Sequence, residues 1–375
     1  SCPLQEKMPV KHLLTPTVAV AALLSAPAFA LANQINTGAE SGAYHSTFCP
    51  ALEKQLGRSK FDHKCTASEG TADNLSRVAA DARQIGYGQL DVFALEAPAL
   101  GGAKTFTRLR TDDVRECVFA VTRNRELTSY GDVAVNAGRL RFILPPKTSG
   151  SAGTFRYLQQ IDSDGVAKAK SVVNAADADE AIKLALSADD TVAFFVQFPD
   201  PDNPRFKNIE AQGGHIVPVI DRAILRSQVD GQKVYFAQET QVANAKWMKS
   251  GTKVVTVCTP LVLFTGTAER VTSDKARQDH KDMIATVQVL KSDVLVPREG
   301  SWSRLWRKTR ELTGQSIEKL VVLSQDAREK AKPMMEKAKE LGGEALEKAK
   351  EAADKAKEAA KGAMEKKPSD APKPQ

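Results

Sequence analysis

Apolar and polar residues alternate along the first third of the chain in short blocks that predict strands and helices in turn. The segments QINTG, HKCTAS and RQIGYGQ are typical of short strands, while AYHSTFCPALEKQL and TADNLSRVAADA carry apolar residues at helical spacing. Thr71 stands at the position expected for the cap of the second helix. Strands and helices in such close alternation favour a parallel sheet that helices cover on both faces.

A second block of the same kind follows the strand-like segment VRECVFAVTRN. From about residue 130, LRFILP, AKSVVN and TVAFFVQ are expected to be strands, with SAGTFRYLQQI and ADEAIKLALSA as helices. The apolar run KVVTVCTPLVLFTG predicts a further strand, and SDKARQDHKDMIATVQ a helix. The predicted fold is therefore α/β, with one lobe over 33–125 and 255–295 and a second over 126–254. A cleft between two such lobes could close on a small ligand.

Residues 1–32 have the pattern of a secretory signal. Lys11 and His12 precede LLTPTVAVAALLSAPAFALA, an apolar stretch that prolines interrupt and that ends in alanines two residues apart. We expect cleavage after Ala30 or Ala32, and an uncleaved membrane anchor is the alternative. No later stretch is apolar enough to cross a bilayer. The mature protein is therefore expected in the periplasm.

Export would place the cysteines in an oxidising compartment, where disulfides form. The four that remain after cleavage allow three pairings. A short intervening loop favours Cys49 with Cys65, and two strand-like runs favour Cys117 with Cys258; four buried free thiols are the alternative. No C-x-x-C motif occurs and the histidines lack ligand spacing, so we predict neither a metal site nor a cofactor.

Composition and charge narrow the class of partner. The chain has 375 residues, of which 42% are hydrophobic, and this is ordinary for a globular protein long enough for two domains. Its formal net charge is +7, yet the basic residues are interleaved with acidic ones along the chain. Because nucleic-acid binding calls for a concentrated basic face, this pattern disfavours such a partner.

Catalytic motifs are incomplete in this sequence. SGSAG has Ser149 where the G-x-S-x-G nucleophile motif has its first glycine, and no Asp and His follow in hydrolase order. Gly38 and Gly42 are spaced as G-x-x-x-G, which falls short of the dinucleotide fingerprint. His215 is the best candidate for a general base, but a single histidine beside glycines is more often structural. We therefore predict that the protein is not an enzyme.

Three segments carry a resemblance to a known family. INTGAESGAYHSTFCPALEKQL resembles the opening strand, T-G-x-x-G-G-x-Y loop and helix of the TAXI group of TRAP transporter solute receptors, which are type II periplasmic binding proteins. ASEGTADNLSRVAADARQIGYGQLDVFAL and DADEAIKLALSADDTVAFFVQFP look like two later blocks of the same family. The resemblance spans roughly residues 34 to 290. Glu40 and Ser41 stand where the family prefers small neutral residues, and His45, Phe48 and Cys49 are unusual on the first helix.

The resemblance implies a two-lobed type II periplasmic-binding-protein-like fold whose loops hold a small organic acid between the lobes. A helix N-terminus offers unpaired backbone N–H groups and a partial positive charge, so hydroxyl-rich and glycine-rich loops there suit an anion. The competing interpretation is that TSGSAG only caps a helix, with Ser149 or Ser151 as the cap. The expected ligand-binding residues are Thr37, Gly38, Ser41, Gly42, Tyr44, Ser68, Asn74, Gln89, Thr148, Ser149, Ser151, Gly153, Thr154 and Phe195.

The end of the chain differs from the family pattern. Over 296–325, WSRLWRKTRELTGQSIEKLVVL predicts an amphipathic helix that could dock on the body or make a peripheral contact with a membrane surface. Over 326–375, alanine, lysine and glutamate predominate and support a solvated helix or a weak coiled coil that ends in disorder.

Together these patterns predict an exported solute-binding protein. It would capture a small, anionic organic solute, a carboxylate or an amino acid, and deliver it to a membrane transporter of TRAP type. The alternative is a periplasmic scaffold or stress-related interaction protein with a degenerate receptor body, in which the helical tail is the working part.

Overall fold

The computed structural model divides the chain into two units, residues 1–32 and 33–375. The first unit, with the predicted signal segment, lies outside the described residues. The structure describes 33–243, 251–295, 310–312 and 314–333, together with residues 337, 348 and 355. Within these ranges no helix is long and apolar enough to cross a membrane.

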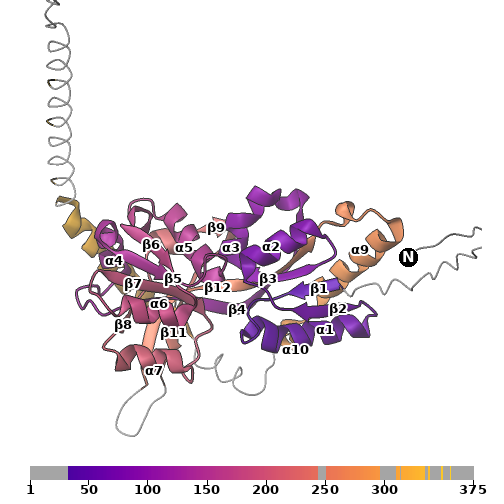
Figure 1. Cartoon of the computed structure of the whole chain (residues 1–375), viewed down its shortest axis with the longest axis horizontal. Coiled ribbons are helices and arrows are strands. Elements are labelled where there is room, and N and C mark those ends of the chain that lie inside the picture. The colour runs from indigo at the N-terminus through magenta and orange to yellow at the C-terminus, as the bar shows by residue number, and fades with distance from the viewer. Residues whose placement is uncertain are drawn as a thin grey trace, which may run out of the picture. The chain divides into compact units, whose positions relative to one another are not determined.

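Helices and strands alternate in the first part of the chain, as the sequence pattern predicts (Figure 1). The elements are β1 (Asn33–Asn36), η1 (Tyr44–Phe48), α1 (Cys49–Arg58), β2 (His63–Thr66), α2 (Thr71–Ala80), β3 (Ile85–Gln89), α3 (Leu90–Glu96), η2 (Ala97–Leu100), η3 (Gly102–Lys104) and the long strand β4 (Phe106–Thr122).

The second part repeats the alternation and then returns through another long strand. Its elements are α4 (Tyr130–Asn136), η4 (Ala137–Arg139), β5 (Arg141–Leu144), α5 (Gly150–Ile161), η5 (Val166–Lys168), β6 (Ser171–Asn174), α6 (Ala178–Ala185), β7 (Thr191–Gln197), α7 (Pro204–Ala211), β8 (His215–Val217), α8 (Arg222–Leu225), β9 (Gln228–Val229), β10 (Gln232–Lys233), β11 (Phe236–Gln241), β12 (Lys253–Gly266), η6 (Ala268–Arg270), α9 (Asp274–Val289), α10 (Ser292–Leu295) and β13 (Arg310–Glu311).

One mixed sheet runs through both parts, in the order β2-β1-β3-β12-β4-β7-β5-β6. The pairs β1–β2, β1–β3, β5–β6 and β5–β7 are parallel. The expectation of a parallel sheet is wrong at its centre, because β12 and β4 run antiparallel to each other and to β3 and β7. Strand β4 leads the chain from the first parallel group to the second, and β12 leads it back. The α/β fold class is confirmed.

Alternating side chains of β12 supply two separate cores. Leu261 and Leu263 pack in the cluster that contains residues of α1 and α9, whereas Val262 and Phe264 pack with residues of α2 and α3. This follows from the two-residue period of a strand, which sends successive side chains to opposite faces. Figure 1 shows α2 and α3 on one side of this part of the sheet and α1 on the other.

The second part is layered in the same way by β7. Phe194 belongs to the cluster that includes α4 and α5, and Phe195 to the cluster that includes α6 and α7. Both rings are almost fully buried. Helix α5 also contacts α2 and α3 of the first part, and this brings the N-terminal loops of α2 and α5 close together.

Both predicted disulfides are confirmed. Cys49 at the start of α1 joins Cys65 in β2, and Cys117 in β4 joins Cys258 in β12. Cys117 and Cys258 are directly opposite each other in the antiparallel register. The alternative of four free thiols is therefore wrong.

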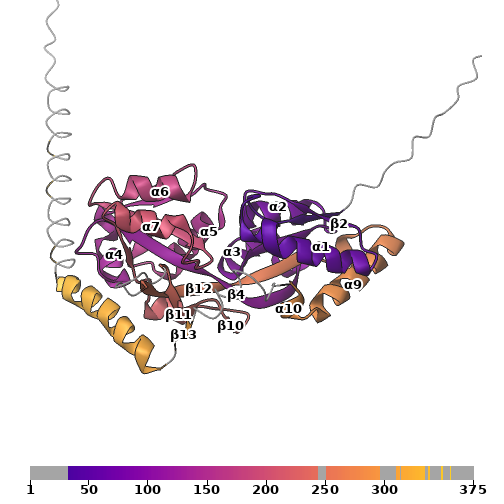
Figure 2. The same cartoon turned by 90° about the horizontal axis from the view of Figure 1, so that it is seen from below.

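The C-terminal region departs from the predicted continuous helix. Arg310–Glu311 is a short strand that pairs with β11, and Leu312 N–H donates to the carbonyl of Ala237. A helix then covers residues 315–333, drawn in yellow in Figure 2, and so crosses the predicted boundary at 325. The tryptophans of the predicted amphipathic helix lie outside the described residues.

This helix is held on the second part by a buried ion-pair network. Arg328 donates from Nη1 and Nη2 to the two carboxylate oxygens of Asp162, at 3.0 and 2.9 Å, and from Nε to Asp221 at 3.1 Å. Ser324 also donates to Asp221, and Val321 joins the core that contains α4 and α5. The described start of the C-terminal tail is therefore part of the folded body.

Candidate functional site

Two loops predicted to hold a ligand meet where α2 and α5 begin. Gly70 immediately precedes α2 with φ of 128°, in a region that favours glycine. A Cβ added to Gly70 would lie 3.2 Å from the backbone nitrogen of Gly150 and 3.3 Å from the carbonyl oxygen of Thr148. The N-termini of the two helices are therefore close neighbours. Thr71 is the first residue of α2 rather than its cap, because Gly70 occupies the cap position.

The polar residues of the first loop bond mainly within that loop and its neighbours. Buried Thr37 donates from its hydroxyl to the carbonyl of Thr66 and lies 3.0 Å from His45 Nδ1. Asn74 donates to the carbonyls of Thr37 and Tyr87, each at 2.8 Å. Ser68 accepts from the N–H of Gly70. These contacts shape the loop around the start of α2.

The hydroxyls at α5 have three different local partners. Ser149 is the N-cap, and its Oγ accepts from Ala152 N–H at 3.2 Å. Ser151 accepts from Val196 N–H, and Thr154 donates to Asp91 at 2.6 Å. The capping interpretation of TSGSAG is thus confirmed for Ser149. The backbone nitrogen of Gly150, the first residue of α5, lies beside Gly70.

The remaining loop residues differ in exposure. Ser41 is exposed and Gly38 is half-buried, while Gly42 N–H closes a turn onto Ala39. Gly153 packs against α3 so closely that an added Cβ would lie 2.7 Å from a methyl group of Val92. The glycine is required at that point by the contact between the two helices.

Phe195, a predicted ligand-binding residue, and His215, the candidate general base, both lie away from the two loops' polar contacts. Phe195 stacks on Phe119 at a centroid distance of 5.4 Å and contacts Phe206, within the core rather than at the loops. His215 lies 3.0 Å from the carbonyl oxygen of Leu127, as expected of a structural histidine.

A half-buried carboxyl group, that of Glu116 in β4, lies beside these loops. Its Oε2 accepts from Tyr44 Oη and from Gln89 Nε2, each at 2.7 Å. Burial raises the pKa of Glu116 to about 7, and the nearby carboxyl of Asp91 adds to the rise, whereas the two hydrogen bonds oppose it. Tyr44 stacks on Tyr87 and is held in place by that contact.

A second carboxyl joins the two parts of the chain directly. Asp91 of α3 is fully buried and accepts from Thr154 of α5 and from Tyr235, at 2.6 and 2.7 Å. Burial raises its pKa. Arg156 and Glu96 add an ion pair between the same two helices at 2.6 Å. Helices α3 and α5 therefore bring the polar groups of both parts together.

Glu116, Asp91 and Tyr235 were not among the predicted residues. The one signal in the sequence is an acidic residue directly before the apolar run CVFAV. That signal identifies an unusual side chain but not its neighbours, because Tyr44 and Gln89 lie 72 and 27 residues away along the chain.

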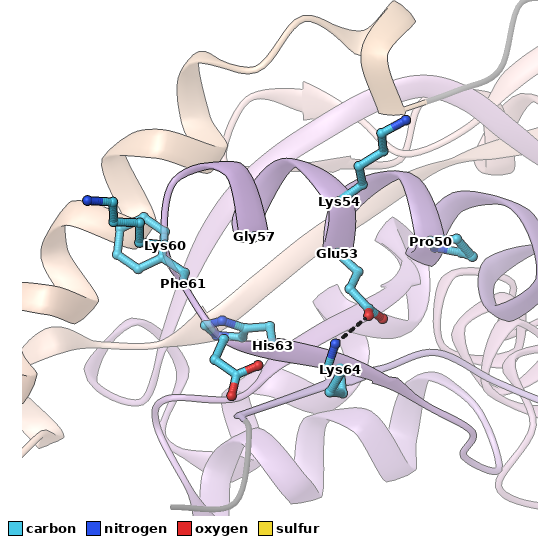
Figure 3. Close-up of a pocket in the computed structure, with 9 residues that line it drawn as sticks. Pro50, Glu53, Lys54, Gly57, Lys60, Phe61, His63 and Lys64 are labelled. Atoms are coloured by element: carbon cyan, nitrogen blue, oxygen red, sulfur yellow. Dashed lines mark hydrogen bonds and ion pairs between the residues drawn. The ribbon is translucent and has the colours of Figure 1, made fainter.

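A separate open cavity of about 550 Å³ lies along α1 and β2 (Figure 3). Lys64 and Glu53 form an ion pair there at 2.9 Å, and Lys60, Phe61 and His63 also line it. Basic and acidic groups are mixed around the wall, so it shows no preference for one charge. We therefore place the candidate site at the loops around Gly70 and Gly150.

No protein-family model matches the sequence, and a search of curated proteins finds no match. Among solved structures the chain is similar to a periplasmic transporter, with 11% identity, 82% of this chain and 97% of that chain covered, and a TM-score of 0.38. It is also similar to a binding protein of a Pseudomonas aeruginosa phosphonate transporter, with 13% identity, coverage of 82% and 99%, and a TM-score of 0.37. A Xanthomonas citri protein bound to ATP has 9% identity, coverage of 80% and 98%, and a TM-score of 0.42.

Proposed function

We propose that this protein is an exported solute-binding protein of type II periplasmic-binding-protein architecture. It captures a small organic solute bearing a carboxylate and delivers it to a membrane transporter, of TRAP type by the sequence resemblance. There is no bond chemistry in this function; the solute stabilises the state in which it contacts both loops.

One observation carries the proposal: the loops that begin α2 and α5 meet across the junction of the two parallel strand groups. Gly70 lies against the backbone of Ser149 and Gly150, so the N-terminus of α2 is next to that of α5, from the other part of the chain. Such groups bind anions because they carry unpaired donors and the positive end of the helix dipole. A solute held there would contact both parts, and its entry requires the loops to separate.

The two disulfides support the proposed periplasmic location. One joins α1 to β2 and the other joins β4 to β12. Disulfides persist in oxidising compartments such as the periplasm. The cleaved signal segment remains part of the proposal.

A thermal-shift screen of the mature full-length chain tests the function. Dicarboxylates, hydroxy acids and amino acids are added singly, and a bound solute raises the melting temperature because it binds only the folded state. A solute at 100 times its dissociation constant adds about 2.7 kcal/mol. Isothermal titration of the best solute then gives its affinity.

A Gly70→Val variant provides the matched control. The added side chain would strain a backbone with φ of 128° and would press against the backbone of Thr148 and Gly150. A folded variant that has lost the response supports binding at these loops. No response of the unaltered protein to any carboxylate contradicts the proposed function and favours the scaffold alternative.

A further inference from the structure

The polar groups between the two loops are incompletely paired. Gln89 is only 4% exposed, and its Oε1 has no hydrogen-bond partner. That oxygen points at the first residue of α5, since a Cβ added to Gly150 would clash with it. A buried polar atom without a partner costs free energy, so an arrangement that keeps one next to a helix N-terminus points to a missing contact.

A second unpaired atom lies on the strand beside Glu116. Thr259 is directly opposite Glu116 in the register of β12 and β4, so both side chains project from the same face. The Thr259 hydroxyl is fully buried and has no hydrogen-bond partner. Two unpaired polar atoms therefore flank the same carboxyl group.

Glu116 itself receives neutral donors only. Tyr44 and Gln89 both bond to its Oε2, and no ion pair to Glu116 is found within the described parts of the chain. A carboxylate taken from water is stabilised best by a cation. As a whole residue, Glu116 is half-buried.

We propose that Glu116 binds the ammonium group of an α-amino acid whose carboxylate lies at the N-terminus of α5. This inference rests on the proposed function and names the class of solute. Gln89 Oε1 and the Thr259 hydroxyl are the neutral acceptors that complete the ammonium site. The opposite ends of one zwitterion would thereby contact β4 and α5 together.

Matched pairs of ligands test the inference on the mature full-length protein. The twenty L-amino acids are compared with amine-free partners, such as glutarate for L-glutamate and propionate for L-alanine, by thermal shift and then by titration calorimetry. We expect the amino acid to bind and its amine-free partner to bind about 10- to 100-fold more weakly, the range of a charged hydrogen bond. Equal binding of the two would overturn the inference while leaving the proposed function intact.

Two variants locate the ammonium site. Glu116→Gln keeps an acceptor for Tyr44 and Gln89 but removes the charge. It should weaken binding of the amino acid by about 10- to 100-fold and leave binding of the amine-free acid unchanged. Glu53→Gln removes the same charge at the exposed pair with Lys64. It should change the affinity for neither the amino acid nor the amine-free acid. Thr259→Val, which keeps the shape of the side chain, should give a smaller loss of the same selectivity. Unchanged selectivity in both site variants contradicts the inference.

The pH dependence of binding separates two ways in which Glu116 could act. The titratable groups that face it are Tyr44 from η1 and Asp91 from α3, while β3 and β12 contribute Gln89 and Thr259. If Glu116 binds the ammonium as a carboxylate, affinity falls by about tenfold from pH 8 to pH 6 in the unaltered protein and stays level in Glu116→Gln. An affinity that rises as the pH falls would mean that a protonated Glu116 donates to an anion, and would overturn the inference.

Should no amino acid and no amine-free acid bind the unaltered protein, the proposed function fails and this inference fails with it. That result differs from equal binding of the paired ligands, which removes only the ammonium site.

Discussion

Two clusters of carboxyl groups in this protein have different kinds of hydrogen-bond donor. Asp162 and Asp221 share the guanidinium of Arg328, which supplies a positive charge and three hydrogen bonds. Asp91 and Glu116 receive hydroxyl and amide donors, and neither has an ion pair in the described part of the chain. Burial of a carboxylate costs least when a cation accompanies it. The first cluster is therefore a completed structural contact, whereas the second has only neutral donors among the described residues.

The largest effect is expected from Arg328→Met. The substitution keeps much of the apolar side chain but leaves Asp162 and Asp221 buried without a cation, which should lower the free energy of unfolding by about 3–5 kcal/mol. Urea denaturation of the two proteins measures the change. A loss below about 1 kcal/mol would show that the Arg328 cation contributes little to the stability of this cluster, and the contrast with Asp91 and Glu116 would then fail.

Glu116→Gln should next change the dependence of stability on pH. The pKa of Glu116 is raised to about 7 in the folded protein, so the folded state holds a proton that the unfolded state releases near pH 4.5. The unaltered protein should therefore lose stability relative to the variant as the pH rises from about 4.5 to 7, by on the order of 2 kcal/mol. Denaturation at a series of pH values measures this difference. Parallel curves for the two proteins would contradict it.

Thr154→Val removes one of the hydrogen bonds to Asp91 between α5 and α3. Tyr235 and the N–H of Val92 still donate to that carboxyl, so we expect a loss of about 1–2 kcal/mol in the free energy of unfolding. Thr286→Val, which removes a surface hydrogen bond of α9, is the matched control. Equal losses in the two variants would mean that the buried contact between the helices contributes nothing extra.

The smallest effect is expected from Arg222→Met. Arg222 pairs with Glu318 of the C-terminal helix at 2.9 Å, and the two side chains are 38% and 61% exposed. Surface pairs of this kind contribute at most about 1 kcal/mol. The melting temperature in buffer and in high salt checks this estimate. A loss as large as that of Arg328→Met would locate the attachment of the helix at its surface rather than at the buried network.

Much of the fold could be predicted from local patterns. The segment KVVTVCTPLVLFTG coincides with β12 from Lys253 to Gly266, and the two disulfide pairings follow from a short loop and two apolar strands. Local patterns do not contain strand direction, so the antiparallel placement of β12 and β4 was missed. The predicted helix across Arg310 and Glu311 was wrong because β11 offers those residues a strand partner.

The candidate site, like the fold, was predicted in part from local sequence patterns. The sequence by itself determined that loops rich in glycine and hydroxyl residues begin α2 and α5, since local composition sets how a helix starts. Only the tertiary structure decided which of these hydroxyls are already bonded, that Gly70 meets Gly150, and that Glu116 lies between Tyr44 and Gln89. The physical reason is distance along the chain: hydrogen bonds and burial join residues that a local pattern cannot pair, and they set both the pKa of an acid and the partners that it lacks.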